Sequence, residues 1–151
     1  MENREQIKRM LTQSRKHAQE QIDRLKDSGT ISFGELNSCI TAYIQAKFML
    51  KPEECEGVDF QELSELSLAK SMKLSPDLVK EFDTARSCAG ATSAIAKKTL
   101  LYMSIEKSLG IELAAEKTPK VHTFEEFSML VWDGMKSSEN WHTKLIGQIR
   151  I

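Results

Sequence analysis

The sequence has few of the residues that mark turns, disulfide frameworks and metal sites. Its 151 residues include only seven glycines, three prolines and three cysteines, and no segment alternates apolar and polar residues over the length of a strand. Three widely separated cysteines without CxxC spacing do not make a disulfide framework or a zinc site. These absences predict an all-α protein in a reducing, cytoplasmic environment.

An excess of one charge and long apolar runs are missing too. The net charge of −1 and the pI near 6.3 argue against a dedicated nucleic-acid or anionic-membrane binder. No apolar run reaches the roughly 18–20 residues of a membrane span, and residues 1–6 are too polar for a secretory signal. The sequence also lacks GxSxG, P-loop, dinucleotide-binding and HExxH motifs. It therefore predicts a globular protein without a membrane span, and not an enzyme.

Residues 3–27 read as one mildly basic helix, because they contain neither proline nor glycine and carry a thin apolar stripe. Such a helix could dock on the rest of the chain or pair with its copy in a homodimer. In the alternative interpretation, it offers a surface that recruits a partner protein. We therefore divide the chain into an N-terminal helical extension (1–28), a helical domain (29–136) and a C-terminal tail (137–151). The stripe consists of Ile7, Met10, Leu11, Ala18, Ile22 and Leu25.

The domain contains clear helix start and stop signals. A capping box formed by Ser32 and Glu35 opens a helix that ends before Pro52. Residues 51–59 read as a loop and residues 60–68 as a short helix or an ordered apolar loop. The sequence Ser-Pro-Asp at 75–77 predicts the start of a further helix near 76–86.

Two more helices follow a run of small residues at 87–94. The first spans Ile95 to Leu109, with Ile95, Tyr102, Ile105 and Leu109 on one face and Leu101 beside them, and Gly110 ends it. A second capping box at residues 123–126 opens the last helix, whose apolar side runs from Phe124 to Met135. In the tail, Leu145, Ile149 and Ile151 would share one face of a short strand.

The run of small residues is the strongest candidate for chemistry. Cys88, Thr92 and Ser93 precede a long helix, and the unpaired N–H groups at a helix start favour a phosphate group or a thiolate. Ser93 could thus carry a phosphodiester-linked group, and Cys88 could be a thiol with a lowered pKa. In the alternative interpretation, the hydroxyl residues are helix caps and the small residues permit close packing.

Three segments resemble the acyl carrier proteins, four-helix domains that carry a phosphopantetheine arm on a serine. The sequence Gly-Ala-Thr-Ser-Ala at 90–94 is similar to the Gly-Ala-Asp-Ser-Leu type of modification motif. Leu-Gly-Ile-Glu-Leu at 109–113 resembles the family's pattern at the end of the following helix. Residues 120–127 resemble in spacing the segment before the last helix. The resemblance covers roughly residues 32–135.

This resemblance implies a four-helix acyl-carrier-like bundle with an added N-terminal helix and an inserted helix before the second main helix. It implies that Ser93 carries 4′-phosphopantetheine, whose thiol holds an acyl or aminoacyl group. Partners would then be a phosphopantetheinyl transferase and acyl-transferring or biosynthetic enzymes. Contact with those partners or with the acyl chain would come from the residues around Ser93 and along the second main helix, namely Thr92, Ala94, Leu101, Tyr102 and Ile105.

Two other functions stay open. Because Thr92 stands where the family motif has an acidic residue, the protein could be a carrier-like interaction or regulatory module that has lost the prosthetic group. Partner contact would then use the basic N-terminal helix or the tail around Trp141. The third interpretation is an enzyme or redox protein that uses Cys88, although no base lies near it in the sequence. We expect a structural role for His122, next to the capping Thr123, because nothing near it in the sequence forms a catalytic triad with it.

Overall fold

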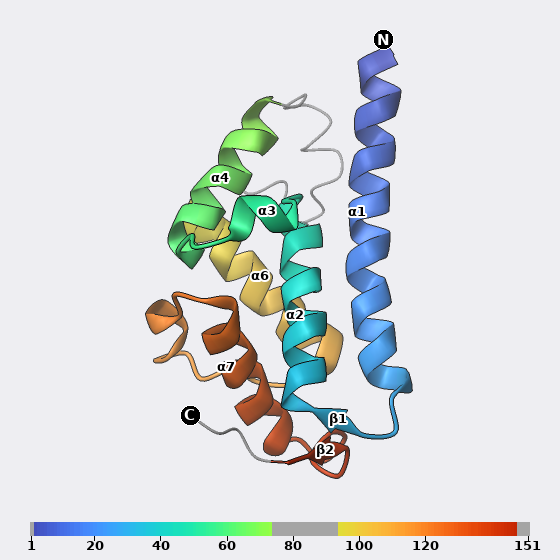
Figure 1. The fold of residues 1–151 in the computed structure, drawn as a ribbon, viewed down its shortest axis with the longest axis vertical. Coiled ribbons are helices and arrows are strands. Elements are labelled where there is room, and N and C mark those ends of the chain that lie inside the picture. Colours follow the sequence, from blue (N-terminus) through green and yellow to red (C-terminus); the bar gives the residue numbers. More distant parts are fainter. Residues whose placement is uncertain (1, 74–93, 148–151) are drawn as a thin grey trace.

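The computed structural model describes residues 2–73 and 94–147, with side chains for 5–70 and 94–147, and most of these residues are helical. The chain forms an all-α bundle, as the sequence predicts (Figure 1). The inserted helix expected near 76–86 lies outside the described residues. The described elements, in chain order, are α1 (Glu2–Asp27), β1 (Ile31–Ser32), α2 (Phe33–Phe48), α3 (Pro52–Cys55), α4 (Phe60–Lys73), α6 (Ala94–Leu109), the 3₁₀ helix η2 (Thr118–Lys120), α7 (Phe124–Lys136) and β2 (Leu145–Ile146).

The N-terminal helix α1 lies along α2, and most of its apolar stripe is buried there, although Met10, predicted in the stripe, is 49% exposed (Figure 1). Leu11, Ala18, Ile22 and Leu25 are each at most 2% exposed, and the hydroxyl of Ser14 donates a hydrogen bond to a main-chain carbonyl of α2. The stripe that a homodimer contact would need is therefore covered by the same chain from Leu11 onward. Of the two arrangements open from the sequence, docking on the domain is the one observed.

Helix α2 begins and ends as its sequence dictates. The hydroxyl of Ser32 accepts a hydrogen bond of 3.2 Å from the backbone N–H of Glu35, and Met49 ends the helix in a left-handed conformation. The predicted loop at 51–59 is wrong in its first half, where Pro52 begins the short helix α3. There the backbone N–H of Lys51 donates a hydrogen bond of 3.0 Å to the carboxylate of Glu54, and Pro52 takes the first helical position, which it favours.

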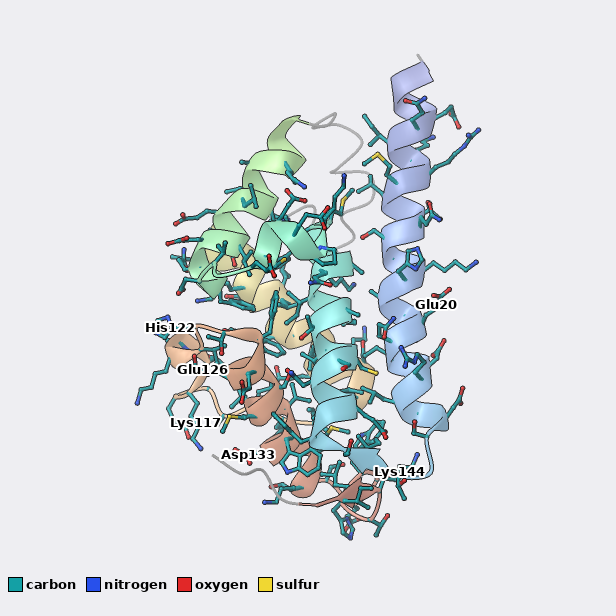
Figure 2. All side chains as sticks on the ribbon, viewed as in Figure 1. Glu20, Lys117, His122, Glu126, Asp133 and Lys144 are labelled. Atoms are coloured by element: carbon teal, nitrogen blue, oxygen red, sulfur yellow. The ribbon has the colours of Figure 1, made fainter. Side chains whose placement is uncertain are left out.

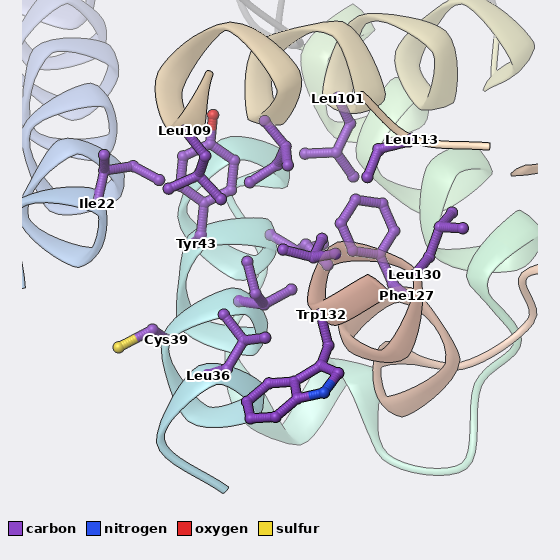
Figure 3. Packing of buried hydrophobic residues seen from close by; sticks show 14 of the residues in the cluster. Ile22, Leu36, Cys39, Tyr43, Leu101, Leu109, Leu113, Phe127, Leu130 and Trp132 are labelled. Carbon is purple, nitrogen blue, oxygen red and sulfur yellow. The ribbon is translucent and has the colours of Figure 1, made fainter. Parts of the chain in front are cut away.

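The core lies between α2, α4, α6 and α7, and Figure 3 shows side chains of α2, α6 and α7 meeting in it. Leu101, Ile105 and Leu109 form the buried side of α6, as the sequence predicts. The placement of Ile95 on this face is wrong, because Ile95 is 72% exposed. Lys97 takes the buried position instead, one turn before Leu101 and two turns before Ile105. Its ammonium group lies 5.7 Å from the ring centre of Phe48.

The segment after α7 returns to the start of α2. Strand β2 pairs in parallel with β1, with Leu145 opposite Ile31, and Trp141 is buried. Trp141 is therefore part of the core and not the exposed partner contact that one interpretation of the sequence proposed. Of the strand predicted in the tail, Leu145 is observed, while Ile149 and Ile151 lie outside the described residues. Within the described ranges, no helix is both long enough and apolar enough to cross a membrane.

Candidate functional site: an apolar groove along α6

The outer side of α6 and the segment before α7 enclose a groove with a volume of about 460 Å³. One wall is the exposed face of α6, and the other is the chain from Leu113 to Pro119, which includes the start of η2. Most of the lining side chains are apolar or aromatic, and Gln61 of α4 closes one end. The lining residues are Gln61, Ile95, Lys98, Thr99, Tyr102, Met103, Glu106, Leu113, Ala115, Thr118 and Pro119.

The groove exists because α6 carries apolar residues on its outer face as well as its inner one. Ile95 and Met103, two turns apart, are 72% and 56% exposed. Tyr102 lies between the two faces of the helix, and its hydroxyl donates a hydrogen bond of 2.8 Å to the backbone carbonyl of Thr118. This bond ties the two walls together. Burial raises the pKa of Tyr102 to about 12, so the phenol is neutral at physiological pH.

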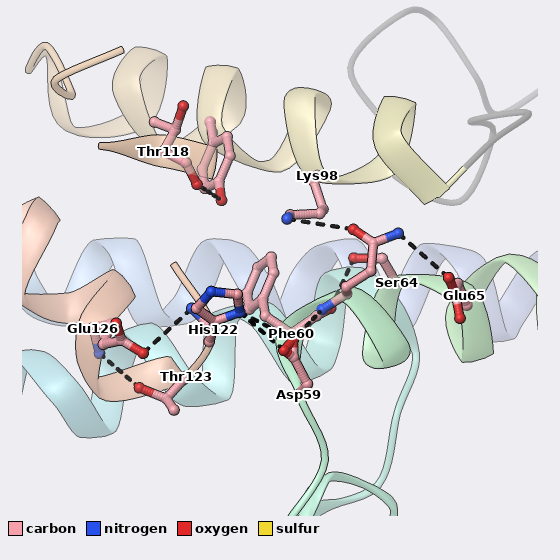
Figure 4. A network of polar contacts seen from close by, with 11 residues as sticks. Asp59, Phe60, Ser64, Glu65, Lys98, Thr118, His122, Thr123 and Glu126 are labelled. Carbon is pink, nitrogen blue, oxygen red and sulfur yellow. Dashed lines mark hydrogen bonds and ion pairs between the residues drawn. The ribbon is translucent and has the colours of Figure 1, made fainter. Parts of the chain in front are cut away.

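The polar side chains of the groove are partly committed to the protein. The ammonium group of Lys98 donates a hydrogen bond of 3.4 Å to the side-chain oxygen of Gln61 and lies 5.6 Å from the ring centre of Phe60 (Figure 4). The carboxylate of Glu106 accepts a hydrogen bond of 3.0 Å from the backbone N–H of Leu113 and so holds the second wall. The groove thus combines apolar surface with one cation, Lys98, at the end near α4 and one carboxylate, Glu106, held against the second wall.

A polar network beside this end joins the starts of α4 and α7 (Figure 4). The ring Nδ1 of His122 lies 3.1 Å from a carboxylate oxygen of Asp59. Asp59 also accepts a hydrogen bond of 3.2 Å from the backbone N–H of Gln61. That bond, followed by the contact with His122, lowers the pKa of the Asp59 carboxyl. Glu126 accepts a hydrogen bond from the backbone N–H of His122. His122 thus stabilises helix starts, in line with the structural role expected of it.

The predicted site residues divide into three groups. Ser93, Thr92 and Cys88 lie outside the described residues, so the attachment site is not placed. Ala94 is half-buried at the first position of α6, and Tyr102 lines the groove. Leu101 and Ile105 are fully buried. Burial leaves no surface of these last two for direct contact with a partner protein, and the other alternative, contact with the acyl chain, stays a prediction for them. They support the helix from the core side.

Sequence reasoning missed the second wall of the groove. Residues 114–119 carry no motif, and only folding brings this segment opposite α6. One signal was available on α6 itself, because Ile95, Thr99 and Met103 recur at a spacing of four residues and form a second face of the helix. In the described part of the chain, no group of histidine, cysteine and acidic side chains is arranged to hold a metal ion.

Comparisons with known proteins give no match for this chain, either to a protein family, to a characterised protein or to a solved structure.

Proposed function

We propose that this protein is a divergent, non-catalytic acyl carrier protein whose α6 groove accommodates the apolar part of its cargo. The observation that carries the proposal is the position of the groove. It runs along α6 from Ile95 onward, and Ser93 precedes the first residue of this helix in the sequence. A phosphopantetheine arm on Ser93 would be attached at the same end of the helix.

The physical properties of the groove suit an acyl chain. Transfer of apolar surface from water contributes about 0.8 kcal/mol for each buried CH₂ group, and Ile95 and Met103 offer exposed apolar surface for such a contact. The start of a 16-residue helix also favours a phosphodiester, because its first N–H groups lack partners within the helix. No acidic residue in the first turn of α6 opposes a phosphate there.

The exposed face of α6 would then also be the surface that partner enzymes meet. Family members usually present an acidic second helix to basic partners, whereas α6 carries Lys98 beside two exposed apolar residues. We infer partners with an apolar patch flanked by acidic residues. A reducing, cytoplasmic location fits the two described cysteines, Cys39 and Cys55, which are free thiols whose pKa is raised by burial.

Modification of Ser93 is the direct test. We expect intact-protein mass spectrometry to find one phosphopantetheine adduct after incubation with coenzyme A and a broad-specificity phosphopantetheinyl transferase. The adduct should be lost in Ser93→Ala. It should persist in Ser87→Ala, a matched control because Ser87 belongs to the same run of small residues. Absence of the adduct with several transferases would refute the carrier function, and its persistence in Ser93→Ala would refute Ser93 as the attachment site.

A second candidate function is a carrier-like interaction module that has lost the arm. The observation in its favour is the exposure of Ile95 at the start of α6, which offers apolar surface directly to another protein. A photo-crosslinking residue placed at Met103 should then capture one defined protein, and the same residue placed at Glu53, exposed on α3, is the control. Equal capture from both positions would contradict this function.

A further inference from the structure

A second cavity, of about 380 Å³, lies where the C-terminal ends of α1 and α6 meet the segment before β2. It is separate from the apolar groove, because it involves only the last residues of α6. Figure 2 shows Lys144 close to the end of α1. The cavity is lined by Lys26, Lys107, Ser108, Leu109, Gly110, Asn140, Trp141 and Lys144.

The charge of this cavity is one-sided. Lysines from α1, from α6 and from the segment before β2 line it, and no aspartate or glutamate is among its lining residues. The whole chain, by contrast, carries a net charge of −1. Lys26 and Lys107 are exposed, and within the described residues no hydrogen bond or ion pair engages their ammonium groups. Lysine in the last turn of a helix offsets the negative end of its dipole. The C-terminal ends of two helices each carry the equivalent of about half a negative charge. Most of the positive charge of the three lysines therefore stays uncompensated.

Two of the carbonyl groups that would repel an anion here already accept hydrogen bonds. A helix end presents unpaired carbonyl oxygens. However, the oxygen of Leu109 accepts a hydrogen bond of 2.6 Å from the indole N–H of Trp141. The oxygen of Lys26 likewise accepts one of 3.0 Å from the ammonium group of Lys144. The side chains left to face a ligand are therefore cationic or, in Ser108 and Asn140, able to donate hydrogen bonds.

We propose that this tri-lysine cavity binds the diphosphate group of a small molecule. Lysine is a compact cation that commonly binds phosphate, and two linked phosphate groups present enough charge to engage several lysines at once. Open space extends beside Gly110, where an added Cβ would meet no atom within 4 Å. The diphosphate is either free or part of a nucleotide, and both forms share the chemistry that the cavity recognises.

The test is a titration of the full chain, followed by ¹H–¹⁵N NMR at constant ionic strength, with pyrophosphate in one arm and ADP in the other. The chain has two tryptophans, so the indole N–H of Trp141 reports on the cavity and that of Trp132, buried against Phe33, is an internal control. We expect saturable shifts for Trp141 and Gly110 with pyrophosphate. Tighter binding of ADP would identify a nucleotide as the source, and equal binding would identify the free diphosphate.

Three variants decide whether the cavity itself is responsible. Lys26→Gln and Lys107→Gln should each weaken binding about tenfold, because each removes a charge-assisted hydrogen bond. Lys136→Gln is the matched control, since Lys136 is an exposed lysine in the last turn of α7 outside the cavity. Its affinity should be unchanged. Failure of both ligands to give saturable shifts would overturn the proposal. Equal weakening of the affinity by all three variants would also overturn it, because that result would indicate attraction by net charge alone.

Discussion

The indole N–H of Trp141 donates a hydrogen bond of 2.6 Å to the carbonyl oxygen of Leu109, the last residue of α6. Gly110 follows with φ of 66°, a left-handed conformation that glycine adopts at little cost. The segment after α7 thus completes the C-terminal end of α6. This contact makes the beginning of the predicted tail a part of the helical domain's core.

Replacement of Trp141 by phenylalanine should destabilise the protein by about 1–3 kcal/mol, because it leaves the buried carbonyl of Leu109 without a donor. Urea unfolding followed by circular dichroism measures this loss. Thr143→Ala is the control, since Thr143 is exposed in the same segment, and it should change the free energy of unfolding by less than about 0.5 kcal/mol. Equal stability of the two variants would show that the hydrogen bond contributes nothing.

Phe127 should be one of the largest single contributors to the core. Its ring is fully buried and stacks on those of Phe60 and Tyr102, with centroids 5.7 and 5.3 Å away. We expect Phe127→Ala to cost about 3–5 kcal/mol in urea melts. Met103→Ala, at a position 56% exposed in the groove, should cost little. A loss below about 1 kcal/mol for Phe127→Ala would contradict the packing described for α7.

The helices were predictable because their start and stop signals are local. Ser32 and Thr123 accept hydrogen bonds from the backbone N–H groups three residues later, and Gly110 takes the left-handed conformation that ends α6. Each of these contacts joins residues close in the sequence, so the residue types alone reveal it. The burial of most of the stripe on α1 was predictable too. The spacing of its apolar residues identifies the face to be buried, even though the sequence does not show which segment covers it.

The errors arise where two distant segments decide the outcome. Helix α6 carries apolar residues on two faces, and the sequence does not say which face meets the core. Burial of Lys97 beneath the ring of Phe48 is a tertiary contact, and it turns Ile95 outward. The two-residue strands at Ile31 and Leu145 pair across most of the chain and are too short to show alternation. For the same reason, the second wall of the groove and the tri-lysine cavity leave no sequence signature.

Gly134 should be intolerant of any side chain. An added Cβ would lie 2.8 Å from the backbone oxygen of Glu112 and 3.3 Å from the side chain of Ile111. We expect Gly134→Ala to destabilise the protein by about 1–3 kcal/mol, despite the better helix propensity of alanine. Gly29→Ala is the matched control, because a Cβ there meets nothing within 4 Å. Thermal unfolding of both variants measures the difference. Equal stability of Gly134→Ala and Gly29→Ala would refute the expectation.

Asp59 should make the stability depend on acid pH. Its pKa in the folded protein lies below the ordinary value of 3.8, chiefly because the backbone N–H of Gln61 donates to its carboxylate. The stabilisation is therefore complete well above pH 3.8 and is lost as the pH falls through the lowered value. Asp59→Asn keeps a side-chain oxygen for the helix start but lacks this titration. Wild type should be the more stable near neutral pH, and the difference should vanish in acid.

His122→Ala separates the two causes of the lowered Asp59 pKa. The hydrogen bond from Gln61 is the largest single cause, and His122 contributes through a hydrogen bond and through electrostatic attraction. Urea melts of His122→Ala across the acid range should therefore retain the part of the pH dependence that comes from Gln61. If this variant were as insensitive to acid as Asp59→Asn, the hydrogen bond from Gln61 would contribute nothing.

Tyr102 should show its burial in alkaline solution. Because burial raises its pKa from 10.0 to about 12, a spectrophotometric titration should contain a phenol that ionises near pH 12. That component should vanish in Tyr102→Phe and persist in Tyr43→Phe, since these are the two tyrosines of the chain. In the unfolded chain Tyr102 ionises at a lower pH than in the folded protein, so its ionisation favours unfolding. Stability should fall as the pH rises from 10 to 12, and Tyr102→Phe should lack this fall. A component that persists in Tyr102→Phe would place the buried phenol elsewhere.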